Sequence, residues 1–267
     1  MAYQEIGELR IYYQIHNPHA LRGTTVTLLH GLGSCGDDWF LQLPALSNFY
    51  QVLTVDLRGH GRSNQLAGWP VMADFSQDVA GLLEALGGYP THVVGLSLGG
   101  AVALQLAADR PDLVRSLTLI NTFARIHVAR VGRMRTFVRV ALLAFGPMHR
   151  MGRWVANELF PYENQAQVRE MAAARISGNQ RSAYVRSMLA VARFDLRSRL
   201  TDISAPTLVV VGDRDTTIPI EVKAELAQGI PEARLEVMTG SGHASPIDAP
   251  EAFNRILLRF LSDVDNR

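Results

Sequence analysis

Cysteine and lysine are almost missing from this chain, and neither sign of charge dominates it. Cys35 is the single cysteine among 267 residues, so no disulfide can form within the chain, which favours a reducing compartment. Lys223 is the single lysine, so arginine supplies the remaining positive charge. A formal net charge of +1 offers no overall electrostatic reason to expect nucleic acid or another highly charged partner.

Long apolar runs are missing as well. No uninterrupted apolar segment approaches the roughly 20 residues that a membrane-spanning helix needs. The first residues lack the basic start and the apolar stretch of a secretory signal. A hydrophobic content of 48% nevertheless suffices for a sizeable core and argues against disorder. We therefore expect a folded cytoplasmic protein without a membrane span.

Strand-like and helix-like segments alternate along most of the chain. Apolar runs typical of strands occupy residues 9–16, 24–30, 50–59, 91–97, 113–122, 206–215 and 233–240. Most of them are followed by a segment with helical spacing of its apolar residues. This alternation predicts an α/β fold with a mostly parallel sheet and helices on both faces.

Residues 123–200 interrupt the alternation. They contain no convincing strand and resemble several helices separated by proline-containing breaks. The block begins after Thr122, at the carboxyl end of a predicted strand, where open α/β sheets bind their ligands. We therefore predict a helical lid at 123–200 over a core formed by residues 1–122 and 201–267.

The predicted lid is rich in arginine. Fourteen arginines stand against four acidic residues, which gives residues 123–200 a local charge near +10. One interpretation is that these side chains cover solvated helix faces. Another is that one or two of them face inward and bind an acidic substrate or an anionic surface. Arg125, Arg130 and Arg133 lie near the base of the predicted lid. The sequence does not say which way these side chains point.

Ser97 stands between two glycines at the junction of a predicted strand and a predicted helix. The stretch GLSLG at 95–99 matches the pattern G-x-S-x-G in the context that this pattern requires. A turn this tight strains the backbone of the serine, and the glycines avoid clashes with neighbouring elements. The amides that begin the helix favour developing negative charge. The pattern thus predicts that Ser97 is a nucleophile rather than an ordinary turn residue.

A serine nucleophile needs a base and an orienting acid, which should follow it in the order acid and then histidine. His243 follows a late predicted strand and is preceded by a glycine, which favours the role of base. The strand before it leads into GDRDTTIP at 212–219, where Asp213 and Asp215 are both candidates for the acid. One would orient the imidazole, and the other would cap a helix or pair with Arg214.

The predicted reaction also needs donors for a tetrahedral oxyanion. We expect the backbone N–H of Leu98, which follows the nucleophile, and that of Leu32 in the glycine-rich loop HGLGS at 30–34. Neither a metal nor an organic cofactor is required. The chain has no paired His/Cys spacing typical of zinc, and the loop at 30–34 lacks the lysine of a phosphate-binding loop.

Five stretches together resemble the α/β-hydrolase superfamily over nearly the whole chain. They are HGLGS (30–34), DLRGHGRS (56–63), GLSLGG (95–100), GDRDTTIP (212–219) and GSGH (240–243). The resemblance implies an eight-stranded, mostly parallel sheet with an inserted helical lid. It also implies that DLRGHGRS is a structural turn. Because relatives with G-x-x-D-x-x-x-P use the last Asp as the acid, the resemblance favours Asp215 over Asp213.

The resemblance also narrows the expected activity. Haloalkane dehalogenases and epoxide hydrolases of this fold carry Asp at the nucleophile position, so Ser97 argues against both. The remaining features look similar to carboxylesterases, 3-oxoadipate enol-lactonases and meta-cleavage product hydrolases. Ala244 counts against the last group, which usually has an aromatic residue directly after the histidine. We expect a carboxylesterase acting on a small to medium ester.

Two alternatives remain open from the sequence. One is an enol-lactonase or C–C bond hydrolase that acts on an acidic ring-cleavage product. The other, from a different class, is a ligand receptor with the hydrolase fold and slow turnover. Fold membership does not choose between them, because one fold hosts many functions.

Overall fold

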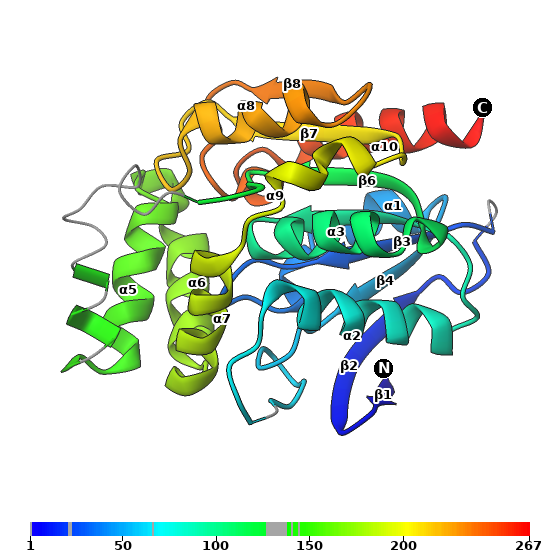
Figure 1. Ribbon diagram of the computed structural model, residues 1–267. Helices are drawn as coiled ribbons and strands as arrows, with labels where there is room; N and C mark the ends of the chain where they lie inside the picture. Colours follow the sequence, from blue (N-terminus) through cyan, green and yellow to red (C-terminus); the bar gives the residue numbers. More distant parts are fainter. Residues whose placement is uncertain (1, 21–22, 66, 127–137, 140, 144) are drawn as a thin grey trace.

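The structure is a computed structural model that describes residues 2–20, 23–65, 67–126, 138–139, 141–143 and 145–267. A sheet of eight strands forms its centre, in the order β1-β2-β4-β3-β5-β6-β7-β8 (Figure 1). β1 and β2 are antiparallel to each other, β2 is antiparallel to β4, and all other neighbours are parallel. The predicted mostly parallel, eight-stranded sheet is therefore confirmed.

The strands agree with the predicted apolar runs, except for one that was missed. They are β1 (Ala2–Ile6), β2 (Leu9–His16), β3 (Thr25–Leu29), β4 (Gln51–Val55), β5 (Thr91–Leu96), β6 (Val114–Ile120), β7 (Thr207–Gly212) and β8 (Arg234–Met238). β1 was not predicted because its side chains alternate only between half-buried and exposed. It pairs with β2 through a two-residue hairpin loop at Gly7, whose φ of 60° suits glycine.

Helices connect the strands and continue into the predicted lid. Helices in the described part of the chain include α1 (Leu43–Ser47), α2 (Met72–Ala85), α3 (Leu98–Asp109), α5 (Met148–Leu159), α6 (Ala166–Ser177), α7 (Arg181–Arg193), α8 (Ile220–Gly229), α9 (Ser245–Asp248) and α10 (Pro250–Asp265), and residues 138–139, 141–143 and 145 are helical as well. Short 3-10 helices occur at η1 (Gly36–Trp39), η2 (Pro111–Leu113), η3 (Glu163–Gln165) and η4 (Arg197–Asp202). None of the described helices is long and apolar enough to cross a membrane.

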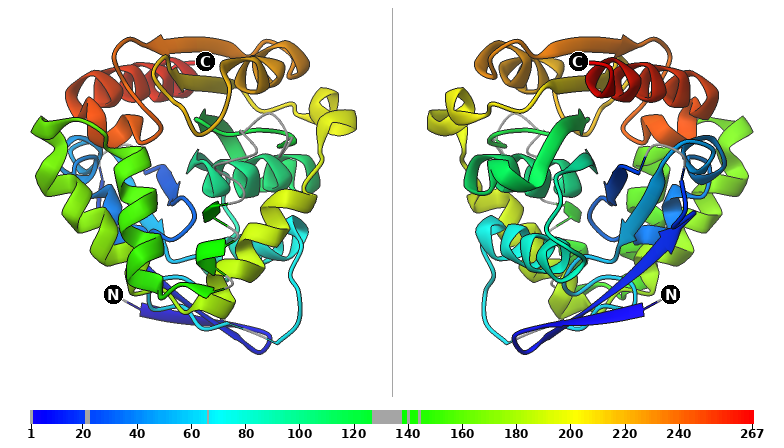
Figure 2. Two further views of the ribbon diagram at one scale, coloured as in Figure 1. Left: turned by 90° about the vertical axis from the view of Figure 1, so that its left-hand side faces the viewer. Right: turned by 90° about the vertical axis from the view of Figure 1, so that its right-hand side faces the viewer.

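Helices lie on both faces of the sheet (Figure 2). A cluster of buried apolar side chains packs on each face. Val209 and Val211 of β7 pack in the layer that contains α2, α3 and α8, while Leu208 and Val210 pack in the layer that contains α1 and α10. This alternation is the two-residue period of a strand, in which successive side chains point to opposite faces. A sheet buried on both faces explains why the strands appear as nearly continuous apolar runs in the sequence.

The helices α5, α6 and α7 lie together beyond one end of the sheet (Figure 1). They share a small apolar cluster of their own, which includes Met151, Val155, Ile176 and Tyr184. These helices fall within the predicted lid, although residues 127–137, 140 and 144 of that block lie outside the described residues. The division into core and lid stays a prediction. Phe145, a large apolar residue of the same block, is 91% exposed.

Candidate active site

Ser97 lies in the turn between β5 and α3, and its backbone adopts an unusual conformation. Its φ is 54° and its ψ is −112°, which costs roughly 1–3 kcal/mol for a residue with a side chain. Neighbouring backbone leaves no room for a Cβ at the two glycines of the motif. A Cβ on Gly95 would lie 2.3 Å from the carbonyl oxygen of Gly99, and one on Gly99 would lie 2.2 Å from that of Leu29. The G-x-S-x-G spacing is thus required by packing.

Asp215 and His243 form a buried pair. His243 Nδ1 lies 2.9 Å from Asp215 Oδ2, and the Asp215 side chain is fully buried. The other carboxylate oxygen accepts the backbone N–H groups of Thr217 at 2.7 Å and Ile218 at 3.3 Å. Burial opposes ionisation of Asp215, but His243, Lys223 and the Thr217 amide outweigh it and hold the pKa of Asp215 well below its usual range.

Asp213, the other candidate acid, has a different environment. Its side chain is exposed, and its Oδ1 accepts the backbone N–H of Gly240 at 2.7 Å. This bond joins the loop after β7 to the loop after β8. Of the two aspartates, the structure brings Asp215 to the imidazole of His243. The catalytic roles of these residues stay a prediction.

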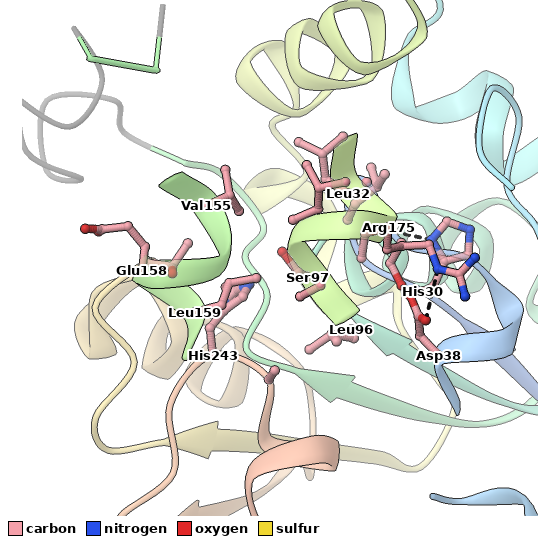
Figure 3. A pocket seen from close by; sticks show the side chains of 18 of the residues that line it. His30, Leu32, Asp38, Leu96, Ser97, Val155, Glu158, Leu159, Arg175 and His243 are labelled. Carbon is pink, nitrogen blue, oxygen red and sulfur yellow. Dashed lines mark hydrogen bonds and ion pairs between the residues drawn. The ribbon is translucent and has the colours of Figure 1, made fainter. Parts of the chain in front are cut away.

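Ser97 and His243 line one cavity. Figure 3 shows the hydroxyl of Ser97 and the imidazole of His243 turned toward the same part of it. Because Nδ1 of His243 is bonded to Asp215, Nε2 is the ring nitrogen left to act on a hydroxyl. Leu32 and Leu98 also line this cavity. Leu98 is the first residue of α3, so its N–H has no acceptor within the helix.

The loop that carries Leu32 is held by a buried histidine. His30 Nε2 accepts the backbone N–H of Leu57 at 3.0 Å, so the proton must lie on Nδ1, which donates to the carbonyl of Gly31 at 2.8 Å. Burial lowers the pKa of His30 to about 4, so the ring stays neutral near neutral pH. His30 is therefore a structural part of the loop.

The stretch DLRGHGRS forms a turn that supports the same loop. Asp56 accepts the backbone N–H of Gly36 at 2.7 Å and that of Arg62 at 2.8 Å. Gly61 has a φ of 54°, and a Cβ there would lie 2.1 Å from Asp56 Oδ2. These contacts agree with the interpretation of the stretch as a structural turn.

The cavity has a volume of about 450 Å³ and is mainly apolar (Figure 3). The apolar residues around it include Leu32, Trp154, Val155, Leu159, Met188 and Ile218. The charged residues that reach it are Asp38, Arg139, Glu158 and Arg175. A lining of this kind suits a ligand with a substantial apolar part and few polar groups.

Among the described residues of the predicted lid, Arg139 and Arg175 reach the cavity, and neither is among the three arginines expected near the base of the lid. Arg175 Nε donates to Asp38 Oδ1 at 3.2 Å, and Arg139 Nη2 donates to the hydroxyl of Tyr184 at 2.6 Å. Arg125 instead pairs with Asp195 at 3.4 Å. Residues 130 and 133 lie outside the described residues.

Three residues of the site were missed by reasoning from the sequence. Lys223 contacts Asp215, Asn121 contacts the loop of His243, and Asn179 contacts the loop of Leu32. The one available signal was that Lys223 is the single lysine of the chain. Among the described residues, no group of three or more His, Cys, Asp or Glu side chains is arranged to hold a metal ion.

The chain is similar to known proteins over almost its full length. The family model described as alpha/beta hydrolase fold matches residues 24–250. Relatives from Azorhizobium caulinodans and Variovorax paradoxus, both named "Putative carbamate hydrolase RutD", are 32% and 34% identical to it. The first alignment covers 99% of this chain and 100% of the relative, and the second covers 95% and 97%.

Two solved structures agree with this assignment. A hydrolase from Pseudomonas aeruginosa has a TM-score of 0.88 and 30% identity, with 97% of each chain covered. An enol-lactonase from Burkholderia xenovorans has a TM-score of 0.88 and 28% identity, with 98% of this chain and all of the other covered. Together with the sheet and the turn at Ser97, these similarities show that the chain is a hydrolase belonging to the α/β-hydrolase fold family.

Proposed function

We propose that this hydrolase cleaves carboxylic esters of small to medium size through an acyl-enzyme formed on Ser97. One observation carries the proposal. His243, which is bonded to the buried Asp215, lines the same apolar cavity as Ser97, a serine held in a strained turn at the start of a helix. This combination supplies an activated nucleophile, its base and the acid that orients the base.

The proposed reaction has two halves, formation of the acyl-enzyme and its hydrolysis. His243 Nε2 takes the proton of the Ser97 hydroxyl while the oxygen attacks the ester carbonyl carbon. The backbone N–H groups of Leu32 and Leu98 donate to the resulting oxyanion. His243 then protonates the leaving alcohol, which leaves an acyl group on Ser97. A water molecule, deprotonated by the same imidazole, releases the acid and restores the serine.

The lining of the cavity favours a substrate that is neutral around its reacting bond. The lining is mainly apolar, and its charged residues include both signs, with Arg175 paired to Asp38. An acyl chain can displace water from such a surface at a gain of about 0.8 kcal/mol per buried CH₂ group. We therefore expect kcat/KM to rise from acetate to hexanoate esters and then to level off as the cavity fills.

The test combines turnover with detection of the intermediate. The wild-type protein should hydrolyse p-nitrophenyl butyrate and show an acyl mass increment that peptide mapping places on Ser97. Ser97→Ala should lose both. Ser198→Ala removes an exposed hydroxyl in η4 and should behave like the wild type. Undiminished turnover in Ser97→Ala would exclude the proposal.

A second candidate is hydrolysis of an acidic enol-lactone, and two observations favour it. The Burkholderia xenovorans structure is named an enol-lactonase, and two arginines of this chain reach the cavity. In that case Arg175→Gln should raise KM for a lactone bearing a carboxylate and leave KM for a neutral ester unchanged. A preference for neutral esters in the wild type would favour the carboxylesterase.

The names of the RutD relatives make carbamates a further group to include in the same panel. A carbamate would be attacked at its carbonyl carbon by the same serine. A slow-turnover ligand receptor is the remaining alternative. It predicts a single burst of product followed by almost no further turnover, whereas an esterase shows steady turnover.

A further inference from the structure

Lys223 lies buried on α8, beside the carboxylate that binds His243. Its side chain is 1% exposed. Its Nζ lies 3.1 Å from Asp215 Oδ2, 3.2 Å from the carbonyl oxygen of Gly212 and 3.3 Å from Asn121 Oδ1. These three acceptors match the three N–H donors of an ammonium group. A buried lysine that is paired and fully hydrogen-bonded can keep its charge.

Lys223 and His243 meet at the same oxygen of Asp215. Oδ2 receives both the ammonium of Lys223 at 3.1 Å and the imidazole Nδ1 at 2.9 Å. Oδ1 is occupied by backbone amides, those of Thr217 and Ile218. Asp215 Oδ2 already balances the positive charge of Lys223. Protonation of His243 would place a second positive charge beside the same oxygen.

Asn121 holds this arrangement together from the end of β6. Its Oδ1 accepts the backbone N–H of Gly212 at 2.9 Å as well as the Lys223 ammonium. Its Nδ2 donates to the carbonyl of His243 at 2.8 Å. Asn121 thus connects the loop that carries the acid to the loop that carries the histidine, and it helps to place Lys223 between them.

The other charged groups around the pair are known from the structure. Asp248 of α9 accepts the backbone N–H of Gly242, the residue before His243, at 2.8 Å. Burial lowers the pKa of Lys223, and the negative charges of Asp215, Asp213 and Glu221 oppose that lowering and favour the ammonium form. The remaining charged residues of the cavity are Asp38, Arg139, Glu158 and Arg175. Lys223 is the cation among these groups that binds Asp215 directly.

We propose that Lys223 is a positioning residue that acts through Asp215 to keep His243 neutral at lower pH than an isolated Asp–His pair would allow. The inference rests on the proposed function, because a neutral imidazole matters where it is the base for Ser97. The charge of Lys223 disfavours the imidazolium, and its hydrogen bond keeps Asp215 Oδ2 aimed at Nδ1.

The pH dependence of catalysis is the first test. We expect the acidic limb of kcat/KM for p-nitrophenyl butyrate to move up by about one pH unit in Lys223→Met, because a neighbouring like charge has been removed. Below the limb this corresponds to a roughly tenfold loss of kcat/KM relative to the wild type. Lys223→Arg, which keeps the charge, should retain the wild-type limb.

Arg214→Met is a matched control. Arg214 is one residue from Asp215, but its side chain is exposed and its guanidinium lies 5.8 Å from the ring centre of Tyr162. Its removal deletes a positive charge nearby without deleting a bond to Asp215. We therefore expect the acidic limb of kcat/KM in Arg214→Met to lie at the same pH as in the wild type. An equal shift in Arg214→Met and Lys223→Met would overturn the proposal, because the shift would then not depend on a bond to Asp215.

A second readout does not depend on turnover. The imidazole of His243 can be titrated by NMR in folded wild-type protein and in Lys223→Gln, whose amide still donates hydrogen bonds but carries no charge. The midpoint should rise in Lys223→Gln. An unchanged midpoint in the folded variant would overturn the inference even if Ser97 is acylated as proposed. A raised midpoint in a protein without esterase activity would support the inference and reject the proposed function.

Discussion

The side-chain amide of Asn179 donates a 2.8 Å hydrogen bond to the backbone carbonyl of Gly33, which lies 146 positions earlier in the chain. Asn179 lies between α6 and α7, and Gly33 lies in the loop that carries the proposed oxyanion donor Leu32. Tyr184 of α7 packs against the same glycine. The helices beyond the end of the sheet therefore hold the loop on which we expect the oxyanion to be stabilised.

Asn179→Ala should lower kcat for p-nitrophenyl butyrate by about tenfold with little change in KM. The bond to Gly33 contributes on the order of 1 kcal/mol, and its loss should loosen the Leu32 amide, which acts mainly in the transition state. Asn266→Ala, which removes a bond within the exposed end of α10, should have no effect on kcat. A wild-type kcat in Asn179→Ala would show that this contact does not position the loop.

Gly33→Ala should impair catalysis far more than Gly7→Ala. Both glycines have positive φ, 80° for Gly33 and 60° for Gly7, so both variants incur backbone strain. A Cβ at residue 33 would lie 2.9 Å from Cε2 of Tyr184, whereas a Cβ at residue 7 meets nothing within 4 Å. Thermal unfolding measures the backbone strain that both variants share, and kcat measures the displacement of the loop that carries Leu32, which is expected in Gly33→Ala. Equal kcat values in the two variants would contradict the expectation.

Asp215→Asn should lower kcat by roughly 10⁴-fold, because the imidazole loses the carboxylate that orients it and stabilises its protonated form. Asp213→Asn should change kcat by no more than a few-fold, since Asp213 bonds to a backbone amide on the surface. Both are measured with the same ester at the same pH. The opposite ranking would assign the acid to Asp213.

The free energy of unfolding should fall as the pH drops below about 6.5, in part because of His60. Burial lowers the pKa of His60 to about 3, and a buried neutral histidine binds fewer protons in the folded state than in the unfolded state. The contribution of His60 to the free energy of unfolding is complete above the pKa that the histidine has in the unfolded state. It declines as the pH falls toward the pKa in the folded state. At pH 5 the loss from this group amounts to about 2 kcal/mol.

Urea unfolding at pH 7.5 and pH 5 measures this effect. His60→Asn should lose less stability between the two pH values than the wild type, because an asparagine can still donate to the carbonyl of Arg58, as His60 Nδ1 does at 3.0 Å, and does not titrate. His19→Asn, at an exposed position, should show the wild-type difference. A wild-type difference in His60→Asn would remove His60 as the cause.

Local features of the chain were sufficient to predict most of the sheet and the nucleophile. Strands buried on both faces leave long apolar runs, so seven of the eight were recognisable, and β1 escaped because its side chains are only partly buried at the sheet edge. The turn at Ser97 could be predicted because the G-x-S-x-G pattern and the strand and helix that flank it are contiguous in the chain. A Cβ on Gly95 would meet Gly99 within the motif, whereas a Cβ on Gly99 would meet Leu29 of the neighbouring strand β3.

Contacts between distant segments could not be predicted in this way. Asp213 and Asp215 follow the same strand two residues apart, and the residues alone do not say which carboxylate reaches His243. The direction of lid arginines was equally open, since Arg139 and Arg175 reach the cavity from helices whose orientation depends on packing. Family resemblance favoured Asp215, but the packed loops after β7 and β8 bring it to the imidazole.

The amino-acid sequence by itself therefore determined the strands, the turn that presents Ser97 and the residue types needed for acyl transfer. These follow from periodicity and from a contiguous motif, both of which are visible without knowledge of the tertiary contacts. The fold alone decided that Lys223 shares an oxygen of Asp215 with His243 and that Asn179 binds the loop of Leu32. Such contacts join segments far apart in the chain, and only the packing of whole elements brings them within hydrogen-bonding distance.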